Sequence, residues 1–551
     1  MISIYVRTLF LVLLVHLCVS GVNFFEGSSP IRSATGSQPT KRVRHQLAKD
    51  QWPQFGHHSG WQTNLNFRKC SSLRLVWEQS PGEGKSQVVG NLQNVFVTSG
   101  TIETRGEVSF AITKVACLSM TDGTIVWTKQ FETQTNENQE TFGGNKLTPQ
   151  STPCIAGQKL IFADFVGRLF CVDLETGNLN WELDTSADLG AESVQFGFTS
   201  SPVLHPKNSN QIVVLAAGPT GGLYKLNSQD GSVLWKSPAK NFSYATPVYS
   251  KIGNKSQWIA VTRDEIIGVA DEDGKRLWSW KLPNPGLTNV PSPMVIDNGQ
   301  ILVAGQGVGG TACLKINFRD EKYETQTVWT NPRMKFFYTN WIALDRNISL
   351  GCTENYLTAF LNQSGQQLGR WRGFGDGNLI AGVDSCLLVN GKGKLSTLIR
   401  TDDGMSVEHE ATIGNGRYWT PPTQIGTFIL IRNSEKLSCF KMETDSSKSV
   451  ANNGRESEPI QQLVFNQALP ADPAKQIMDT YETKGQVAAL ALYAKFRKQG
   501  KLTAEIRIEL AETAYQSSLM PLAKMIMDHA VQDLPKSKLI RNKLKEWSKG
   551  K

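Results

Sequence analysis

Beyond its first 20 residues the sequence has no long hydrophobic segment, and it has few residues of the kinds that form catalytic or metal sites. No later apolar run approaches the roughly 18 residues of a membrane-spanning helix, so we expect a soluble mature protein. There is no Gly-x-Ser-x-Gly motif and no Cys-x-x-Cys-His motif, and the seven histidines are scattered. These absences exclude the usual sequence signatures of serine hydrolases and of c-type haem proteins.

The net charge of +9 is concentrated near the two ends of the chain. Residues 41–50 carry an excess of three positive charges and residues 535–551 an excess of six, so the part between them is near neutral. A neutral centre gives no general reason to expect a nucleic-acid partner. The basic C-terminus is predicted either to contact an anionic membrane or cell-wall polymer, or to be a solvated tail.

The first 20 residues are typical of a secretory signal peptide, with Arg7 before an apolar run and Ser20-Gly21 as a small-residue exit. We therefore predict export to the periplasm or the extracellular space, with the segment either cleaved or retained as an anchor. Residues 21–50 are polar and lack any period, which is typical of a disordered lead.

The central part of the chain repeats one short phrase. Each copy has a glycine six residues after its first position and a tryptophan ten residues after it; the clean copies are 117–127, 171–181, 225–235 and 268–278. A fixed period of this size indicates one supersecondary unit copied many times.

Each copy is predicted to be a β-hairpin within a larger sheet. A dipeptide such as Asp122-Gly123 forms the turn, because glycine supplies the positive φ that a tight hairpin needs. The tryptophan that ends the second strand can bury about 150–250 Å², and we expect it to lie between one sheet and the next. A Ser/Thr-Pro step such as Ser201-Pro202 opens an earlier strand, where proline loses no ladder donor. The unit therefore has four antiparallel strands, which is one propeller blade.

Degenerate copies extend the count to eight units. The last of them, ending at residue 442, lacks a closing strand, whereas residues 73–79 form a closing strand with nothing before it. We therefore predict an all-β fold over residues 51–445: an eight-bladed β-propeller with Trp-docking blades, closed by N- and C-terminal strands. Such closure leaves no open sheet edge in the ring.

The pattern changes after the propeller. Residues 446–470 are predicted to be a polar linker. Residues 471–551 have helical periodicity and are predicted to form a small α-helical hairpin bundle, with helices around 487–496, after Thr503, around 522–530 and around 539–547.

Four cysteines share one position of the repeat: Cys117, Cys171, Cys313 and Cys439. Equivalent positions of neighbouring blades lie beyond the roughly 7 Å Cα separation that a disulfide allows. These four are therefore predicted to be small buried side chains of the blade core. The state of four others stays open: Cys70, Cys154, Cys352 and Cys386.

The phased Gly, Trp and Ser/Thr-Pro positions resemble the PQQ-like repeat of the quinoprotein alcohol dehydrogenase-like superfamily, over about residues 50–445. The phrase Trp52-Pro-Gln-Phe-Gly56 resembles the lead-in of many secreted bacterial proteins of this type. This resemblance implies the propeller fold. The superfamily contains quinone-dependent dehydrogenases and non-enzymatic scaffolds such as the propeller lipoprotein of the outer-membrane barrel-assembly machinery, so the fold does not select the function.

The dehydrogenases of this superfamily typically have a vicinal cysteine pair and a Ca²⁺–PQQ centre with a Glu, an Asn and a catalytic Asp converging on the channel. The sequence has no vicinal pair, and no motif places the other three. We therefore predict no catalytic residue, no cofactor and no metal, and a protein or ligand-binding scaffold of the cell envelope. A PQQ-dependent oxidoreductase is the alternative, and envelope polysaccharide binding is the third hypothesis.

Loops that lead into the first strand of several blades are aromatic. Such loops lie on one face of a propeller, and clustered aromatic side chains are typical of binding hot spots. We predict that this rim binds a protein or peptide partner, the alternative being packing between blades. The rim residues are Phe196, Phe198, Tyr244, Phe337, Tyr338, Tyr418 and Trp419.

Overall fold

The computed structural model divides the chain into two compact units, residues 1–464 and 465–551. It describes residues 50–56, 61–63, 65, 67, 70–135, 141–142, 145–146, 148–192, 196–241, 243–296, 299–383, 385–401, 404–444, 461–464, 477, 480, 489–498, 502, 504–516, 520–535 and 537–549. The predicted signal peptide and almost all of the predicted lead and linker lie outside these residues. No helix in the described part of the chain is long and apolar enough to cross a membrane.

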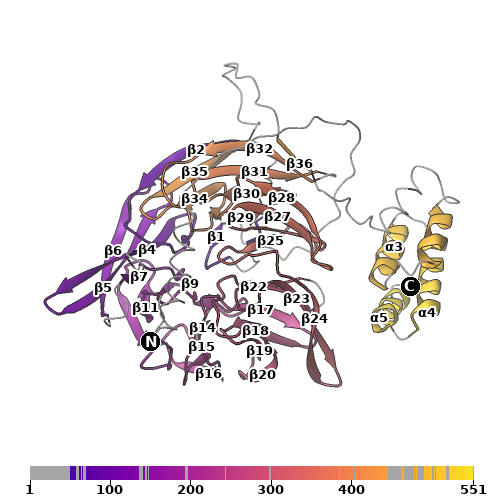
Figure 1. The fold of residues 1–551 in the computed structure, drawn as a ribbon, viewed down its shortest axis with the longest axis horizontal. Coiled ribbons are helices and arrows are strands. Elements are labelled where there is room, and N and C mark those ends of the chain that lie inside the picture. The colour runs from indigo at the N-terminus through magenta and orange to yellow at the C-terminus, as the bar shows by residue number, and fades with distance from the viewer. Residues whose placement is uncertain are drawn as a thin grey trace, which may run out of the picture. The chain divides into compact units, whose positions relative to one another are not determined.

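The first unit is a ring of eight antiparallel sheets, which confirms the predicted eight-bladed propeller (Figure 1). Blade 1 contains β1 (Gln51–Trp52), β3 (Val89–Asn91), β4 (Asn94–Arg105), β5 (Val108–Ser119) and β6 (Ile125–Gln134). Blade 2 contains β9 (Cys154–Ala156), β10 (Lys159–Ala163), β11 (Arg168–Asp173) and β12 (Leu179–Asp184). Blade 3 contains β13 (Val203–Leu204), β14 (Gln211–Ala216), β15 (Gly222–Asn227) and β16 (Val233–Pro238). Blade 4 contains β17 (Val248–Ile252), β18 (Lys255–Val261), β19 (Glu265–Ala270) and β20 (Arg276–Lys281).

The remaining blades follow in chain order. Blade 5 contains β21 (Met294–Val295), β22 (Gln300–Gly305), β23 (Gly310–Arg319) and β24 (Lys322–Asn331). Blade 6 contains β25 (Trp341–Ala343), β26 (Ile348–Cys352), β27 (Tyr356–Leu361) and β28 (Gln367–Arg372). Blade 7 contains β29 (Asn378–Ala381), β30 (Ser385–Val389), β31 (Lys394–Arg400), β32 (Gly404–Thr412) and β36 (Gln461–Val464). Blade 8 contains β33 (Thr423–Ile425), β34 (Phe428–Arg432), β35 (Leu437–Thr444) and β2 (Cys70–Gln79), and a small pair, β7 (Thr141–Phe142) and β8 (Asn145–Lys146), lies between blades 1 and 2 in the chain.

Tryptophan side chains join consecutive blades, as predicted. The indole of Trp127 in blade 1 covers Gly177 of blade 2 so closely that a Cβ there would lie 2.7 Å from the ring. Its Nε1 donates a hydrogen bond to the carbonyl of Leu174, three residues before that glycine. The same two contacts recur at four more junctions, with Trp77 on Gly123, Trp181 on Gly231, Trp235 on Gly274 and Trp329 on Gly365.

Blade 4 departs from this prediction. Trp278 turns back into its own sheet, where Gly268 stands at the position that holds cysteine in several other blades and leaves room for the indole. Its Nε1 donates to Oε1 of Gln257 at 2.6 Å. The physical reason lies in blade 5, because its long β23–β24 hairpin turns at Asp320 and Glu321 and presents no turn glycine to receive a ring.

The Ser/Thr-Pro steps also connect blades. The backbone N–H of Gln87 donates to Oγ1 of Thr152, that of Thr152 to Oγ of Ser201, and that of Ser201 to Oγ1 of Thr246. Each hydroxyl therefore satisfies a buried amide at the equivalent place of the preceding blade, which explains why a hydroxyl residue precedes the proline.

The ring is closed by the two ends of the propeller sequence. β2 pairs with β35 in antiparallel register, with Leu73 opposite Met442 and Trp77 opposite Cys439. This confirms that residues 73–79 complete the last blade.

One strand lies where a linker was expected. Residues 461–464, inside the predicted linker 446–470, form β36 on the outer edge of blade 7, with Gln461 opposite Val407 and Val464 opposite Gly404. Within this short strand the side chain of Leu463 is buried. Four residues are too few for a reliable period in the sequence.

The second unit is helical in the described residues. Residues 489–498 are helical, and α3 (Ala504–Gln516), α4 (Met520–Asp533) and α5 (Lys538–Lys549) follow. Their apolar sides form one core around Tyr493, Leu510 and Ile526. Arg507 is buried among them and donates to the carboxylate of Asp533 at 2.7 Å.

Candidate functional site

One face of the propeller carries the loops that join the fourth strand of each blade to the first strand of the next, together with the loops between second and third strands. We call it the connecting face and the former loops the connecting loops. All seven rim residues lie on connecting loops, those that enter blades 3, 4, 6 and 8. The antiparallel order of four strands places both kinds of loop on the same side of the ring.

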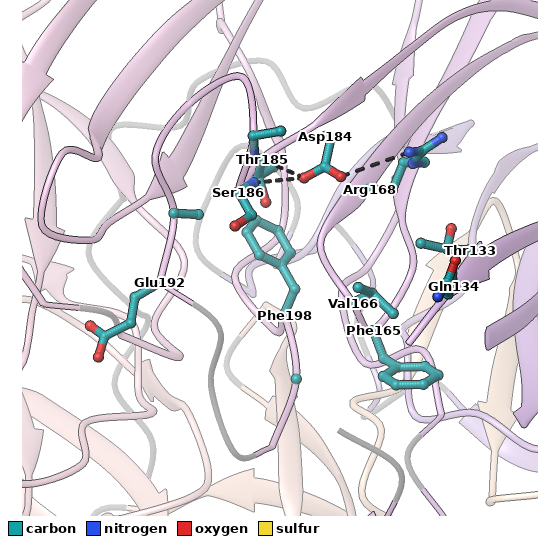
Figure 2. A pocket seen from close by; sticks show the side chains of 13 residues that line it. Thr133, Gln134, Phe165, Val166, Arg168, Asp184, Thr185, Ser186, Glu192 and Phe198 are labelled. Carbon is teal, nitrogen blue, oxygen red and sulfur yellow. Dashed lines mark hydrogen bonds and ion pairs between the residues drawn. The ribbon is translucent and has the colours of Figure 1, made fainter. Parts of the chain in front are cut away.

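A cavity of about 390 Å³ opens on this face between blades 1 and 2 (Figure 2). One wall is the end of β6 at Thr133 and Gln134, and another is the loop between β10 and β11 at Phe165 and Val166. The remaining lining comes from Arg168 at the start of β11, from Asp184 at the end of β12, and from the connecting loop that follows: Thr185, Ser186, Ala187, Ala191, Glu192, Gly197 and Phe198. The predicted rim residue Phe198 is thus part of a cavity.

The charges along this cavity are partly paired. Arg168 lies 3.3 Å from a carboxylate oxygen of Glu182 and 3.7 Å from one of Asp184. The other oxygen of Asp184 accepts the backbone N–H of Ser186 and Ala187. Beneath them, Asp164 accepts the N–H of Gly167 and Arg168, and its burial raises the pKa of that carboxyl. Hydrogen bonds to Asp184 therefore stabilise the start of the connecting loop, and hydrogen bonds to Asp164 stabilise the loop between β10 and β11.

Glu192 is less well paired. Its backbone N–H donates to the carbonyl of Ala217 in blade 3. Its Oε2 is buried and has no hydrogen-bond partner among the described residues. In Figure 2 the Asp184–Arg168 pair lies on one side of Phe198 and Glu192 on the other.

The structure separates the predicted rim residues by exposure. Tyr244 and Tyr418 are buried, with 7% and 5% of their surface exposed, while Phe196, Phe198 and Phe337 are partly buried. Tyr338 and Trp419 are exposed by 47% and 38%. The rim is thus made of an inner set that packs between blades and an outer set that reaches solvent.

Rim residues form three separate groups at different places on the face. The rings of Phe196 and Tyr244 meet edge to face with centroids 5.6 Å apart, and burial raises the pKa of Tyr244 to about 12. On connecting loops elsewhere, Phe337 lies against Tyr338, and the guanidinium of Arg417 lies 5.2 Å from the ring of Trp419. The structure therefore presents three separate aromatic groups rather than one continuous band.

The lead-in segment lies against the first strands of the ring. β1 pairs with β3, the carbonyl of Pro53 accepts from Ile155 in blade 2, and Oε1 of Gln54 accepts from Leu204 in blade 3. Further along, Thr63 and Ala381 of blade 7 are hydrogen-bonded. This segment therefore occupies space at the inner edges of four blades.

The alternative that the sequence left open is a Ca²⁺–PQQ centre, and the expectation of no cofactor stays a prediction. Such a centre needs several oxygen ligands on one cation. Among the described residues, no group of three His, Cys, Asp or Glu side chains is placed to hold a metal ion.

Sequence reasoning did not identify Arg168, Glu192 or the wall formed by blade 1. The wall goes with the long strands of blade 1, where β4 and β5 are 12 residues each, against five and six for β10 and β11. The excess length carries Ile102 and Ala111 to Phe165 and Val166 of blade 2. No sequence signal distinguishes Glu192 from other charged loop residues.

Comparison with known proteins agrees with this architecture. Residues 111–369 match a PQQ-repeat family model described as outer membrane protein assembly factor BamB. Residues 111–369 are therefore similar to the PQQ-like repeat of that family, in agreement with the resemblance seen in the sequence. No curated protein sequence matches the chain.

Solved structures that are similar to the chain include a BamB protein and a quinohemoprotein dehydrogenase. BamB from Moraxella catarrhalis is 14% identical, with a TM-score of 0.43 over 70% of this chain and 100% of that one. Quinohemoprotein alcohol dehydrogenase from Comamonas testosteroni is 10% identical, with a TM-score of 0.48 over 81% of this chain and 86% of that one. The similar structures thus include an assembly factor and an enzyme.

Proposed function

We propose that this protein is an exported scaffold that binds a protein partner through the connecting face of its propeller. The observation that carries the proposal is the exposure of Tyr338 and Trp419 on two connecting loops of that face. A large aromatic side chain that is exposed to water gains favourable burial when it enters an interface. Such side chains are enriched among binding hot spots. The description of the matching family as an assembly factor supports a partner of protein type.

The proposal is tested by capture of a partner from native envelope extract on immobilised full-length protein. The variants Tyr338→Ala and Trp419→Ala are expected to lose the captured protein while keeping the wild-type melting temperature. Ile125→Ala is the matched control, because Ile125 is also an exposed apolar residue, at 58%, but lies on the outer strand β6. Equal capture by all three variants would contradict the proposal.

A separate experiment addresses the oxidoreductase alternative. Purified protein is incubated with PQQ and Ca²⁺ and then examined by absorbance, metal content and dye-linked alcohol oxidation. Stoichiometric uptake with turnover would replace the scaffold proposal. Export is tested by N-terminal sequencing of the native protein, which is expected to begin near Gly21.

A further inference from the structure

One position of the repeat carries an exposed aliphatic side chain in four consecutive blades. It is the residue of the fourth strand at the β-bulge, two positions before the docking tryptophan where that residue is present. In blades 8, 1, 2 and 3 it is aliphatic and exposed: Leu75, Ile125, Leu179 and Val233. In blades 4, 5 and 6 it is polar: Arg276, Thr327 and Gln367. Charged side chains on an edge strand hinder its pairing with another chain, and blades 8, 1, 2 and 3 have none at this position.

Blade 7 shows what this position looks like when a further strand is present. Its equivalent residue is Val407, which is also aliphatic but only 5% exposed. Val407 lies opposite Gln461 of β36, the strand that pairs with the outer edge of β32. Leu463 of β36 is buried as well and lies opposite the buried Met405. Strand addition at the outer edge therefore goes together with burial of the aliphatic side chain at this position.

The outer edge of blade 1 is open to the same kind of pairing. β6 is the last strand of its sheet, and no strand among the described residues pairs with its outer edge (Figure 1). It is ten residues long, whereas β36 has four. Its first two side chains, Ile125 and Val126, are both aliphatic and exposed. An open edge offers its backbone donors and acceptors to an extended segment.

We propose that the outer edge of β6 binds an extended segment of a partner protein by strand addition, with a leucine or valine of that segment packed on Ile125 and Val126. The occupant is assigned from β36, which is uncharged and carries leucine and valine where it pairs with β32. This surface is not the connecting face, because Ile125 lies at the start of β6, beside the β5–β6 turn on the opposite side of the ring. The inference therefore goes beyond the proposed function. Capture of the connecting-face partner by Ile125→Ala is expected whether or not β6 binds a strand.

The probe is a capped peptide that places the sequence of residues 461–464 between serine and lysine residues, which keep it soluble. Its binding to the full-length protein is measured by fluorescence anisotropy, and the place of binding by amide hydrogen exchange with mass spectrometry. Saturable binding with slower exchange in residues 125–134 is the expected result. The absence of binding, or slower exchange only in other strands, would overturn the assignment to β6.

A second pair of probes tests the backbone pairing itself. These peptides have the same side chains but carry N-methyl groups on every second amide, in the two possible alternations. The alternation that blocks the donors facing β6 is expected to bind at least about tenfold more weakly, because main-chain hydrogen bonds supply much of the affinity in strand addition. Unchanged binding of both methylated peptides would show contact through side chains alone and would overturn strand addition.

A double variant removes the two aliphatic side chains from the edge. Ile125→Ser combined with Val126→Ser is expected to weaken peptide binding at least about fivefold, with a melting temperature near that of wild type because both residues are exposed. Val328→Ser is the control: Val328 is an exposed aliphatic residue on β24 of blade 5, where Thr325 and Thr327 are hydrogen-bonded to blade 4. Wild-type affinity in the double variant would overturn the proposal. If the double variant does not fold, the methylated peptides still decide the question with wild-type protein.

The same edge of a second copy of this chain is the other occupant that the experiment must separate. Sedimentation velocity of the wild-type protein is expected to show a monomer at the concentrations used for peptide binding. A dimer that the combined Ile125→Ser and Val126→Ser substitutions abolish would assign the edge to a second copy and overturn the assignment to a partner protein.

Discussion

The indole of Trp77 covers Gly123 and thereby joins the last blade of the ring to the first. A Cβ on Gly123 would lie 2.7 Å from the ring, and Nε1 of Trp77 donates to the carbonyl of Met120 at 2.9 Å. Trp77 belongs to β2. This strand follows β1 in the sequence and comes before every other strand of blades 1 to 7, yet it completes blade 8. This pair therefore completes the ring with the same contact that joins four other pairs of consecutive blades.

Loss of the seam tryptophan is expected to destabilise the whole propeller. Trp77→Ala should cost about 3–5 kcal/mol of unfolding free energy, because a large buried ring leaves a cavity. Denaturant unfolding followed by circular dichroism measures the change. Trp419→Ala, which removes an indole that is 38% exposed, should cost much less. Similar values for the two variants would contradict the docking role.

Asp271 is expected to be a stability centre between blades 3 and 4. Its carboxylate accepts from Nε2 of His205 at 2.9 Å and from Nε1 of Trp258 at 2.8 Å, and it lies 2.6 Å from Nζ of the buried Lys225. Asp271→Asn should cost about 3–5 kcal/mol, because it leaves a buried ammonium without its counter-ion. Asp273→Asn, on the exposed turn nearby, should change the melting temperature little.

The same carboxylate gives an expected pH dependence. Burial alone would raise the pKa of Asp271, but hydrogen bonds from His205, Lys225 and Trp258 outweigh it and lower that pKa. A lowered folded-state pKa contributes stability that is present above the unfolded value of about 3.9 and is lost as pH falls toward the folded value. The stability difference between wild type and Asp271→Asn should therefore shrink below about pH 4. A difference that is constant with pH would contradict this assignment.

The cysteines of the propeller are expected to be unreactive in the folded protein. Seven of them are free and buried: Cys117, Cys154, Cys171, Cys313, Cys352, Cys386 and Cys439. Burial raises the pKa of the Cys117 and Cys171 thiols to about 12, so few thiolates exist at neutral pH. Thiol labelling followed by peptide mass spectrometry should modify these seven only after unfolding. Rapid labelling of any one in native protein would contradict its placement.

The helical unit is expected to unfold in a transition separate from that of the propeller. Asp533 binds both Arg497 and the buried Arg507, and hydrogen bonds from these two residues lower the pKa of its carboxyl. Asp533→Asn should lower the transition of the helical unit in calorimetry and leave that of the propeller in place. Asp528→Asn, an exposed acid on the same helix α4, is the control. A shift of the propeller transition would show that the two units do not unfold separately.

Repeat positions could be predicted from the sequence because each depends on neighbours a few residues away. Gly123 and Gly177 adopt the positive φ that their turns require, and Cys117 and Cys171 take the same buried place in successive sheets. The position of Trp278 could not be predicted in the same way. It depends on the missing side chain of Gly268 and on the length of a hairpin in the next blade.

The candidate site could be predicted only in part. Its face followed from the order of the strands, and Phe198 was correctly placed on that face. The exposure of Tyr338 and the burial of Tyr418 were not predictable, because adjacent blades decide how much of each ring is covered. Partner binding by the rim stays a prediction.

The sequence by itself determined the kind of blade, the number of blades and the pairing of both ends in one sheet. Those features follow from local turn geometry and from a period that every copy must satisfy. Only the tertiary structure decided which aromatic rings reach solvent and where blade 1 extends to enclose a cavity. These depend on side chains brought together from different blades, and no spacing along the chain encodes such distances.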